Sequence, residues 1–226
     1  MSTQFTNRQW RLPNNENKDK QSNYSLSFDD ANLDHINLGT ISEINGLTNF
    51  SFSLWMKPKF GNPRVNKLVF GNRDSNNSNR GVALLIGDAV NKTSYFYIIS
   101  ATGNVIFNLG TNIWTENAWN HFAVTYDGSQ IKAYINNGSP ITGSGSGATL
   151  ESTSPFYIGR DWVSNSQHFR GQLDAFSIFD YVLSASQITT LYGSSSTGIG
   201  NPQSITPILW RRIISVTKIR LTEQII

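Results

Sequence analysis

The segment from residue 119 to 138 constrains the fold of this chain more than any other part of the sequence. It reads WNHFAVTYDGSQIKAYINNG, with apolar and polar residues alternating in two runs. A period of two predicts β-strands with one buried face. The break at Asp127-Gly128-Ser129 has the composition of a tight turn. The segment therefore predicts an antiparallel hairpin whose core-facing side chains are Ile131, Ala133 and Ile135.

Similar runs, bounded by turn-forming residues, recur along the chain. They predict further strands at residues 24–28, 35–38, 50–57, 67–70, 81–86, 94–99, 105–107, 156–158 and 171–179. A stretch of Gly and Ser at 143–147 is expected to be a flexible surface loop. Many short strands predict an all-β fold, an antiparallel two-sheet sandwich.

A single helix is predicted near the end of the folded region. Ser184 is a favourable N-cap residue, and Gly193 is expected to end the helix. The apolar side of this helix would be formed by Leu183, Ile188, Leu191 and Tyr192.

The composition narrows the classes of function. The 226 residues include no cysteine, which excludes disulfides, thiolate zinc sites and cysteine nucleophiles. No apolar run approaches the roughly 20 residues of a membrane-spanning helix. The net charge of +3 is concentrated after Pro207, where the charged residues are Arg211, Arg212, Lys218, Arg220 and Glu223. Because acidic and basic residues are equal in number in the rest of the chain, a basic nucleic-acid-binding face is not expected.

The chain divides into four parts by composition. We expect a polar N-terminal arm at 1–22, one domain at 23–193, a linker at 194–204 and a basic, apolar tail at 205–226. The arm has no apolar core of the kind found in secretory signals. The tail is either an assembly peptide that docks on a partner or the remnant of a following module.

Several blocks of the sequence resemble a known family. The segments are WNHFAVTYDG at 119–128, IKAYINNG at 131–138, FRGQLD at 169–174, and the opening runs YSLSFD at 24–29 and FSFSLWMK at 50–57. In this order they resemble the laminin-G-like jelly rolls of the concanavalin A-like lectin/glucanase superfamily, over roughly residues 23 to 193. The resemblance implies two sheets, one of them concave, with glycans or cell-surface proteins bound at a sheet edge or on the concave face.

The resemblance also implies a structural calcium ion. Its carboxylate ligands would be Asp29 or Asp34 in the first turn and Asp174 on the closing strand, because calcium prefers oxygen ligands. Two departures from the family pattern lie beside them: Asp30 stands at the usual glycine, and Ala175 at a position that is often acidic. The alternative is that Asp29 and Asp30 form an Asx turn while Asp174 caps a buried backbone amide.

Catalysis is not expected. The β-glucanases of this superfamily use paired carboxylates in a Glu-x-Asp-x-x-Glu pattern. None of the five glutamates begins that pattern; they are Glu16, Glu43, Glu116, Glu151 and Glu223. His121, on a predicted central strand, is expected to be a packed core histidine rather than a base.

Two polar loops have the composition of a sugar-binding surface, which needs an aromatic ring and planar amides or carboxylates. The first loop, 72–80, offers Arg73, Asp74, Asn76 and Asn77. The second loop, 160–168, offers Asp161, Trp162, Asn165 and His168. The alternative is that both are ordinary solvated loops and that Trp162 is packed.

The sequence as a whole predicts a non-enzymatic, lectin-like binding module that recognises glycans or surface proteins. It would act outside the cell or on a virus or phage particle. The alternative is a structural or decoration protein of a virion or extracellular assembly that uses the jelly roll for subunit packing. In either case residues 203–226 would contact homo-oligomer or particle subunits.

Overall fold

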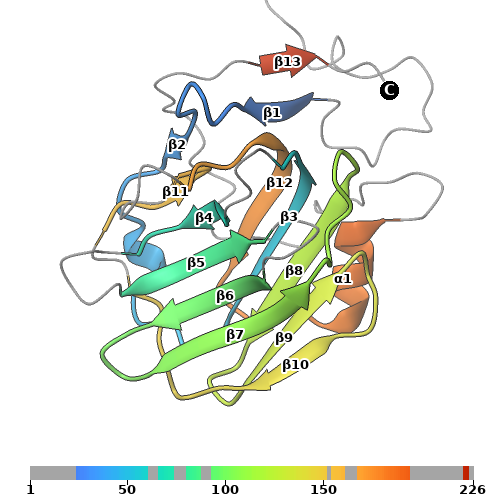
Figure 1. Ribbon diagram of the computed structural model, residues 1–226. Coiled ribbons are helices and arrows are strands. Elements are labelled where there is room, and N and C mark those ends of the chain that lie inside the picture. The colour runs from blue at the N-terminus through green and yellow to red at the C-terminus, as the bar shows by residue number, and fades with distance from the viewer. Residues whose placement is uncertain are drawn as a thin grey trace, which may run out of the picture.

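The computed structural model describes residues 24–60, 66–73, 80–87, 93–151, 154–160, 167–193 and 221–223. Two antiparallel sheets lie face to face (Figure 1). The seven-stranded sheet has the order β10 (Ile141–Ser144), β9 (Gln130–Ile135), β8 (Asn120–Tyr126), β3 (Phe50–Pro58), β12 (Gly171–Phe179), β1 (Tyr24–Phe28) and β13 (Leu221–Glu223). The six-stranded sheet has the order β2 (Ile36–Asn37), β11 (Tyr157–Ile158), β4 (Lys67–Gly71), β5 (Gly81–Ile86), β6 (Thr93–Ile99) and β7 (Asn104–Thr111). The predicted all-β jelly-roll sandwich is confirmed.

The hairpin that dominates the sequence is formed by β8 and β9. Phe122 lies opposite Ile135, and Val124 lies opposite Ala133. The Asp127 carboxylate holds the turn by accepting hydrogen bonds from the backbone N–H groups of Ser129 at 2.9 Å and Gln130 at 2.6 Å. The predicted core-facing residues are confirmed, since Ile131 and Ala133 are fully buried and Ile135 packs against the same cluster.

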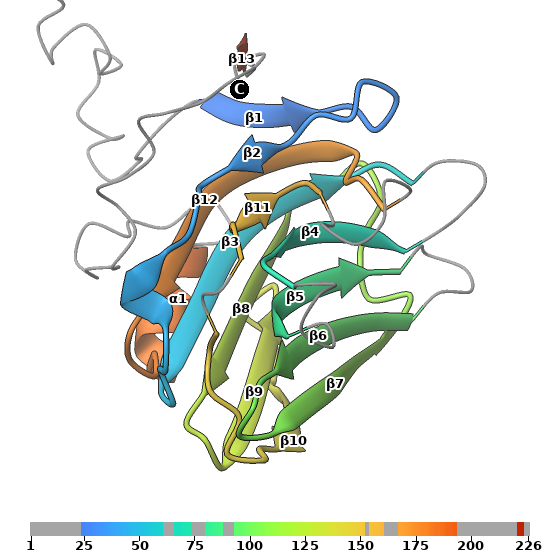
Figure 2. The same ribbon diagram turned by 90° about the vertical axis from the view of Figure 1, so that its left-hand side faces the viewer.

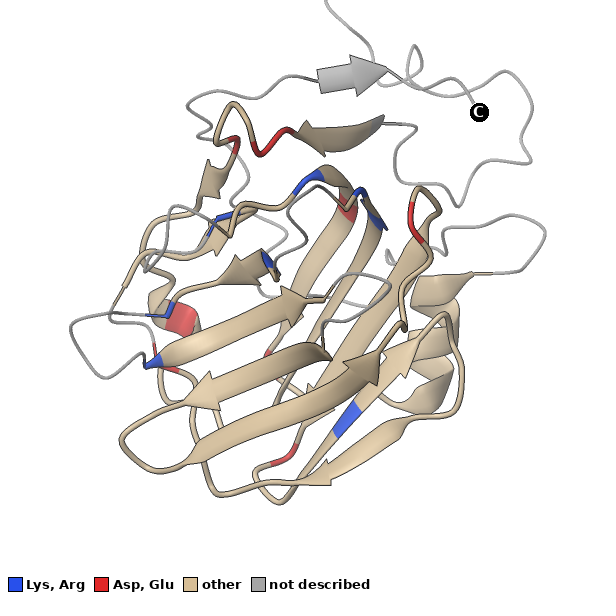
Figure 3. Ribbon diagram, in the orientation of Figure 1, with Lys and Arg blue, Asp and Glu red and all other residues tan. Residues whose placement is uncertain are grey.

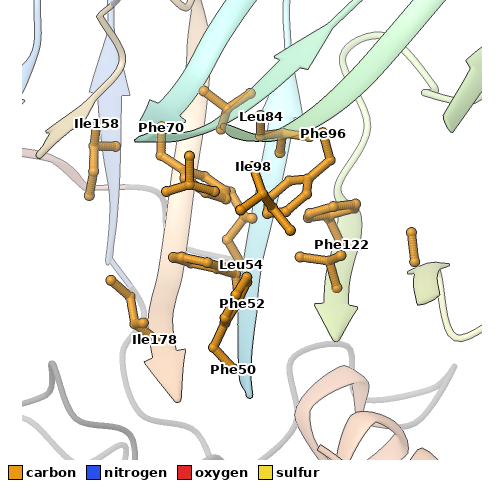
Figure 4. Close-up of a cluster of buried hydrophobic side chains, with 14 of the residues drawn as sticks. Phe50, Phe52, Leu54, Phe70, Leu84, Phe96, Ile98, Phe122, Ile158 and Ile178 are labelled. Atoms are coloured by element: carbon orange, nitrogen blue, oxygen red, sulfur yellow. The ribbon is translucent and has the colours of Figure 1, made fainter. Parts of the chain in front are cut away.

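The main core fills the space between the sheets, with β3 at its centre. Phe50, Phe52, Leu54 and Met56 alternate along this strand and face the six-stranded sheet. The ring of Phe52 lies 5.0 Å from that of Phe70 on β4 and 6.0 Å from that of Phe96 on β6, measured between centroids. Figure 4 shows these rings converging with Leu84, Phe122, Ile158 and Ile178 from neighbouring strands. Each fully buried Phe or Leu contributes about 1.5–3 kcal/mol to folding.

Helix α1 (Ala185–Tyr192) covers the opposite face of the seven-stranded sheet, as Figure 2 shows edge-on. Its Ser184 N-cap and Gln187 form a capping box, which satisfies two backbone donors at the helix start. Gly193 forms its C-cap, and its N–H donates to the carbonyl of Thr189 at 2.9 Å. The apolar side packs in a second cluster that consists of Ala123, Tyr134, Phe179, Leu183, Ile188 and Leu191. The predicted helix and its limits are confirmed.

A β-bulge divides β12. The register with β3 shifts between Asp174 and Ser177, and Ala175 has a φ of +50°, in the left-handed region. The extra residue lets Leu173 and Ile178 both face the main core, while Asp174 and Ser177 face α1.

The strand boundaries correct two expectations. Residues 141–144 form strand β10, so the predicted loop at 143–147 is wrong for its first two residues. Gly143 is required there because a Cβ atom would lie 2.7 Å from the ring of Phe107. Strand β7 also extends well beyond the predicted 105–107. The N-terminal arm, the linker and most of the tail lie outside the described residues, and β13 pairs with β1.

Three polar side chains lie in one cross-strand row beneath α1. Asp174 is opposite Trp55, and Trp55 is opposite His121. Tyr192 of the helix stacks on Trp55 with ring centroids 5.4 Å apart, and the Nε2 atom of His121 lies 3.0 Å from the hydroxyl of Ser53. Burial lowers the pKa of His121 to about 3, as expected for a packed core histidine.

Asp174 responds to burial in the opposite sense. Burial raises the pKa of its carboxyl from 3.8 to about 6, although the N–H of Ala175 donates to it at 2.7 Å and opposes the shift. Burial therefore disfavours the charged form of both groups: His121 stays neutral down to about pH 3, and Asp174 keeps its proton up to about pH 6.

We expect Asp174→Asn to stabilise the protein at pH 7.5. The folded protein keeps the Asp174 proton up to about pH 6, whereas the unfolded chain releases it near 3.8, so stability falls as pH rises through this window. The shift corresponds to at most about 3 kcal/mol. Urea unfolding should show a higher free energy of unfolding for the variant at pH 7.5, and the difference from the wild type should vanish by about pH 4. Asp180→Asn, on the exposed surface, is the control. Lower stability of the variant at pH 7.5 would contradict this and indicate that the ionised carboxylate has a favourable partner.

We expect His121→Gln to remove an acid-sensitive part of the stability. The unfolded chain gains a proton on this imidazole below 6.5, whereas the folded protein does so only near 3, so stability falls as pH drops between these values. Where unfolding takes up one full proton, the free energy of unfolding falls by about 1.4 kcal/mol for each pH unit. Unfolding midpoints between pH 7 and 4 should fall less steeply for the variant than for a His35→Gln control. Parallel pH curves for the wild type and His121→Gln would refute the assignment.

Candidate functional site

The outer face of the six-stranded sheet, turned away from the main core, faces the viewer in Figure 1. A cross-strand row runs over this face from β11 to β7 and consists of Tyr157, Gly71, Ala83, Tyr97 and Ile106. Directly opposed residues of an antiparallel pair project on the same side of the sheet. Ile106, at the β7 end of the row, is 62% exposed, whereas Ala83 and Tyr157 are buried. The row is therefore open to solvent at β7 and buried from β5 to β11.

The period of two in β6 places the aromatic residues. Phe96 and Ile98 point into the main core, and Tyr95 and Tyr97 point outwards and are half-buried. The two tyrosine rings lie 5.7 Å apart. Tyr97 packs beside Leu68, Ala83 and Leu85, a small apolar cluster on the outer face. The same alternation that builds the core therefore builds an aromatic surface on the other side.

An arginine lies over each end of the row. The guanidinium carbon of Arg73 is 5.2 Å from the ring centroid of Tyr97, and that of Arg160 is 5.4 Å from the ring of Tyr157. Burial raises the pKa values of both tyrosines, and the neighbouring guanidinium groups oppose that shift. Cation–π contacts of this kind fix long arginine side chains above an aromatic ring. We call these residues the tyrosine–arginine face: Arg73, Tyr95, Tyr97, Tyr157 and Arg160.

Both predicted ligand loops begin at this face. The 72–80 loop leaves the end of β4, and its base is fixed by Asn72, which is 2% exposed. The Asn72 side chain accepts from the Val82 N–H at 2.9 Å and donates to the Glu151 carbonyl. The 160–168 loop returns along the start of β4, where the Leu68 N–H donates to the Gln167 carbonyl at 2.9 Å. The fold brings the two loops to opposite ends of one strand.

Two of the predicted ligand residues lie in the part of the chain that the structure describes. Arg73 lies on the tyrosine–arginine face. His168 is 3% exposed and forms a bridge with Leu68, so it belongs to the scaffold beneath the second loop. The others lie outside the described residues and stay predictions: Asp74, Asn76, Asn77, Asp161, Trp162 and Asn165.

Sequence reasoning did not select Tyr95, Tyr97, Tyr157 or Arg160. The available signal was the Tyr-x-Tyr pattern of residues 95–97, because two tyrosines at alternate positions of a strand share one face. Their place in one cross-strand row with Tyr157 could not be inferred, since that row depends on strand order.

The carboxylates predicted to bind calcium each accept a hydrogen bond from a backbone N–H of their own segment. Asp34 accepts the Asp29 N–H at 3.0 Å, and Asp29 accepts the Ala31 N–H at 3.1 Å, which is the Asx-turn alternative. Phe28, next to Asp29, pairs with Gly171 at the start of β12. Asp174 lies three residues further along β12, which is roughly 10 Å along the strand. Within the described ranges, no three His, Cys, Asp or Glu side chains are grouped to hold a metal ion. Calcium binding stays a prediction.

The glutamates within the described ranges serve the scaffold. Glu116 accepts the Phe60 N–H at 2.9 Å, and Glu151 accepts the Ala101 N–H at 2.6 Å and pairs with Arg80 at 3.8 Å. Glu43 is exposed and accepts a bond from the Ser42 hydroxyl at 3.0 Å. In the same part of the chain, no helix combines the length and the apolar character needed to span a membrane.

Comparison with solved structures finds the same fold in proteins of low sequence identity. A pentraxin from Limulus polyphemus superposes with a TM-score of 0.55, at 16% identity, covering 84% of this chain and 86% of that one. A putative carbohydrate-binding protein from Bacteroides ovatus gives 0.57, at 16% identity, with 78% and 49% covered. The sialidase carbohydrate-binding module CBM40 of Ruminococcus gnavus, bound to α2,3-sialyllactose, gives 0.56, at 13% identity, with 75% and 96% covered. Identities this low show likeness of fold alone.

Sequence comparison identifies one curated relative. The adhesion G-protein coupled receptor V1 of Danio rerio is 27% identical over 152 residues, which are 65% of this chain and 2% of the receptor. The chain thus spans only a small part of that protein's length. The family model of concanavalin A-like lectins and glucanases (laminin G type) matches residues 30–189, most of the chain. The chain therefore belongs to the concanavalin A-like lectin/glucanase superfamily, as the resemblance of its sequence blocks to that family implied.

Proposed function

We propose that this protein is a non-enzymatic, lectin-like module that binds glycans through the tyrosine–arginine face. The observation that supports this most directly is the pair of half-buried tyrosines, Tyr95 and Tyr97, whose rings lie 5.7 Å apart on the outer face of the sheet. Gly71, Ala83 and Tyr157 beside them are buried, so these two rings are the aromatic surface that a sugar would contact.

The chemistry of this face suits a sugar. Aromatic rings offer large apolar contact area to the carbon face of a pyranose ring. A guanidinium group carries five N–H donors in a fixed plane, and these match hydroxyl or carboxylate oxygens. Because Arg73 and Arg160 are held over tyrosine rings, less side-chain entropy is lost when a ligand binds.

The relatives support the same class of function. Two of the structural neighbours are named as carbohydrate-binding, one with a bound sialyllactose, and the receptor relative is named for adhesion. We infer glycans or surface proteins as partners and a site of action outside the cell or on a particle surface. Assembly through residues 203–226 stays a prediction, because only Leu221–Glu223 of that segment is described.

We expect Tyr97→Ala to weaken glycan binding about tenfold, which corresponds to roughly 1.4 kcal/mol from a lost ring contact and a displaced Arg73. A glycan array would identify the ligand, and calorimetry would give the affinity of each variant. Tyr181→Ala, a half-buried tyrosine near α1, is the matched control and should bind normally. Thermal unfolding would confirm that both variants fold.

Two results would reject the proposal. One is equal binding by Tyr97→Ala and the wild type. The other is absence of glycan binding together with loss of oligomer or particle incorporation after deletion of residues 203–226, which would favour a structural protein instead.

A further inference from the structure

A second cavity lies at the end of the seven-stranded sheet, away from the tyrosine–arginine face. It has a volume of about 280 Å³ and lies where β1 and β3 end and β12 begins. This is slightly smaller than the usual 300–1,000 Å³ of drug-sized ligand pockets, so it suits one small group. Gly171 helps to line the cavity with a φ of +136°, and a Cβ there would collide with the carbonyl oxygen of Lys57. The missing side chain lets β12 approach the backbone of β3 closely at the edge of the cavity.

Three cationic side chains line this pocket: Lys57, Lys59 and Arg170. Their positions are fixed by backbone bonds between three segments. The Lys59 N–H donates to the Arg170 carbonyl at 2.9 Å, and the Asn117 N–H donates to the Pro58 carbonyl at 2.9 Å. Figure 3 shows blue segments where β3 ends and β12 begins. The cations are thus placed by the ends of ordered strands.

The charge of the pocket is only partly balanced. Asp30 pairs with Lys67 at 2.8 Å and with Arg170 at 3.7 Å. Among the lining residues the carboxylate is that of Asp29, and its oxygens accept bonds from Ala31 and Asn32 of its own turn. Within the described ranges, no carboxylate lies within 4.0 Å of the amines of Lys57 or Lys59. Two ammonium groups therefore add to the positive potential of a concave site.

This combination selects the ligand by charge. Lysine ammonium groups and a guanidinium group bind carboxylate and sulfate oxygens through charge-assisted hydrogen bonds. The amide side chains of Asn117 and Gln172 also line the pocket and can donate to the same oxygens. We propose that the pocket binds one anionic group, a carboxylate or a sulfate ester, of an acidic polysaccharide. The site belongs to the other sheet and does not depend on the proposed function of the tyrosine–arginine face.

The test uses the full chain and three polymers: polygalacturonate for carboxylates, dextran sulfate for sulfate esters, and neutral dextran. Calorimetry is done at about 0.1 M salt, where exposed charges are partly screened. We expect it to detect binding of one or both polyanions and no binding of neutral dextran. The polyanion that binds more tightly shows whether the pocket prefers a carboxylate or a sulfate ester. Lys57→Gln and Lys59→Gln should each weaken binding about tenfold. Lys132→Gln on β9, which removes the same charge elsewhere, should change it less than about twofold.

Two further variants separate shape from charge. Ser27→Tyr fills the pocket from a half-buried position on β1 without changing the net charge, and it should weaken polyanion binding as strongly as Lys57→Gln. Tyr97→Ala should leave polyanion binding unchanged, so this site and the glycan face are tested independently. The proposal is overturned if neither polyanion binds, if Lys132→Gln weakens binding as much as Lys57→Gln, or if Ser27→Tyr binds like the wild type.

Discussion

Strand β3 is covered on both faces, and the arrangement of the whole sandwich follows from that. Its apolar residues face the six-stranded sheet, while Ser51, Ser53 and Trp55 lie beneath the helix side of the seven-stranded sheet. The hydroxyl groups of Ser51 and Ser53 on that second face have hydrogen-bond partners, whereas the indole N–H of Trp55 has none among the described residues. Ser51 accepts the Leu183 N–H at 2.9 Å and donates to the Tyr181 carbonyl at 2.8 Å, which fixes the approach to α1. A single strand thus positions the core, the helix and the buried polar row.

The two sheets take different roles because their outer faces are covered differently. The helix lies over part of the seven-stranded sheet, and it buries Trp55 and His121 with Tyr192. No helix among the described residues covers the six-stranded sheet, where Tyr95 and Tyr97 stay half-buried. A sheet face that carries half-buried aromatic residues is typical of a surface that binds something.

Local patterns explain what the sequence could predict. The alternation of β3, β8 and β9, the Asp127 turn and the Ser184 cap are each encoded within a few residues, so they were predicted closely. Strand β10 was missed because Gly143 looks like a loop residue, and its reason for being glycine is the ring of Phe107, far away in the chain. The tyrosine–arginine face was missed for the same kind of reason. Tyr157 and Tyr97 are placed in one cross-strand row only by the order of β11, β4, β5 and β6.

The hydrogen bonds of the Asn72 side chain have a consequence for sequence variation in the 72–80 loop. Its side chain bonds to strand β5 on one side and to the Glu151 carbonyl on the other, and a Cβ at Gly81 would collide with it. The two ends of the 72–80 loop are therefore fastened by atoms that belong to the sandwich. Residues between these fastened ends can be exchanged or lengthened without altering strand register, because long surface insertions add little to the entropy of loop closure. The fold thus offers a place where specificity can diversify while the scaffold is conserved.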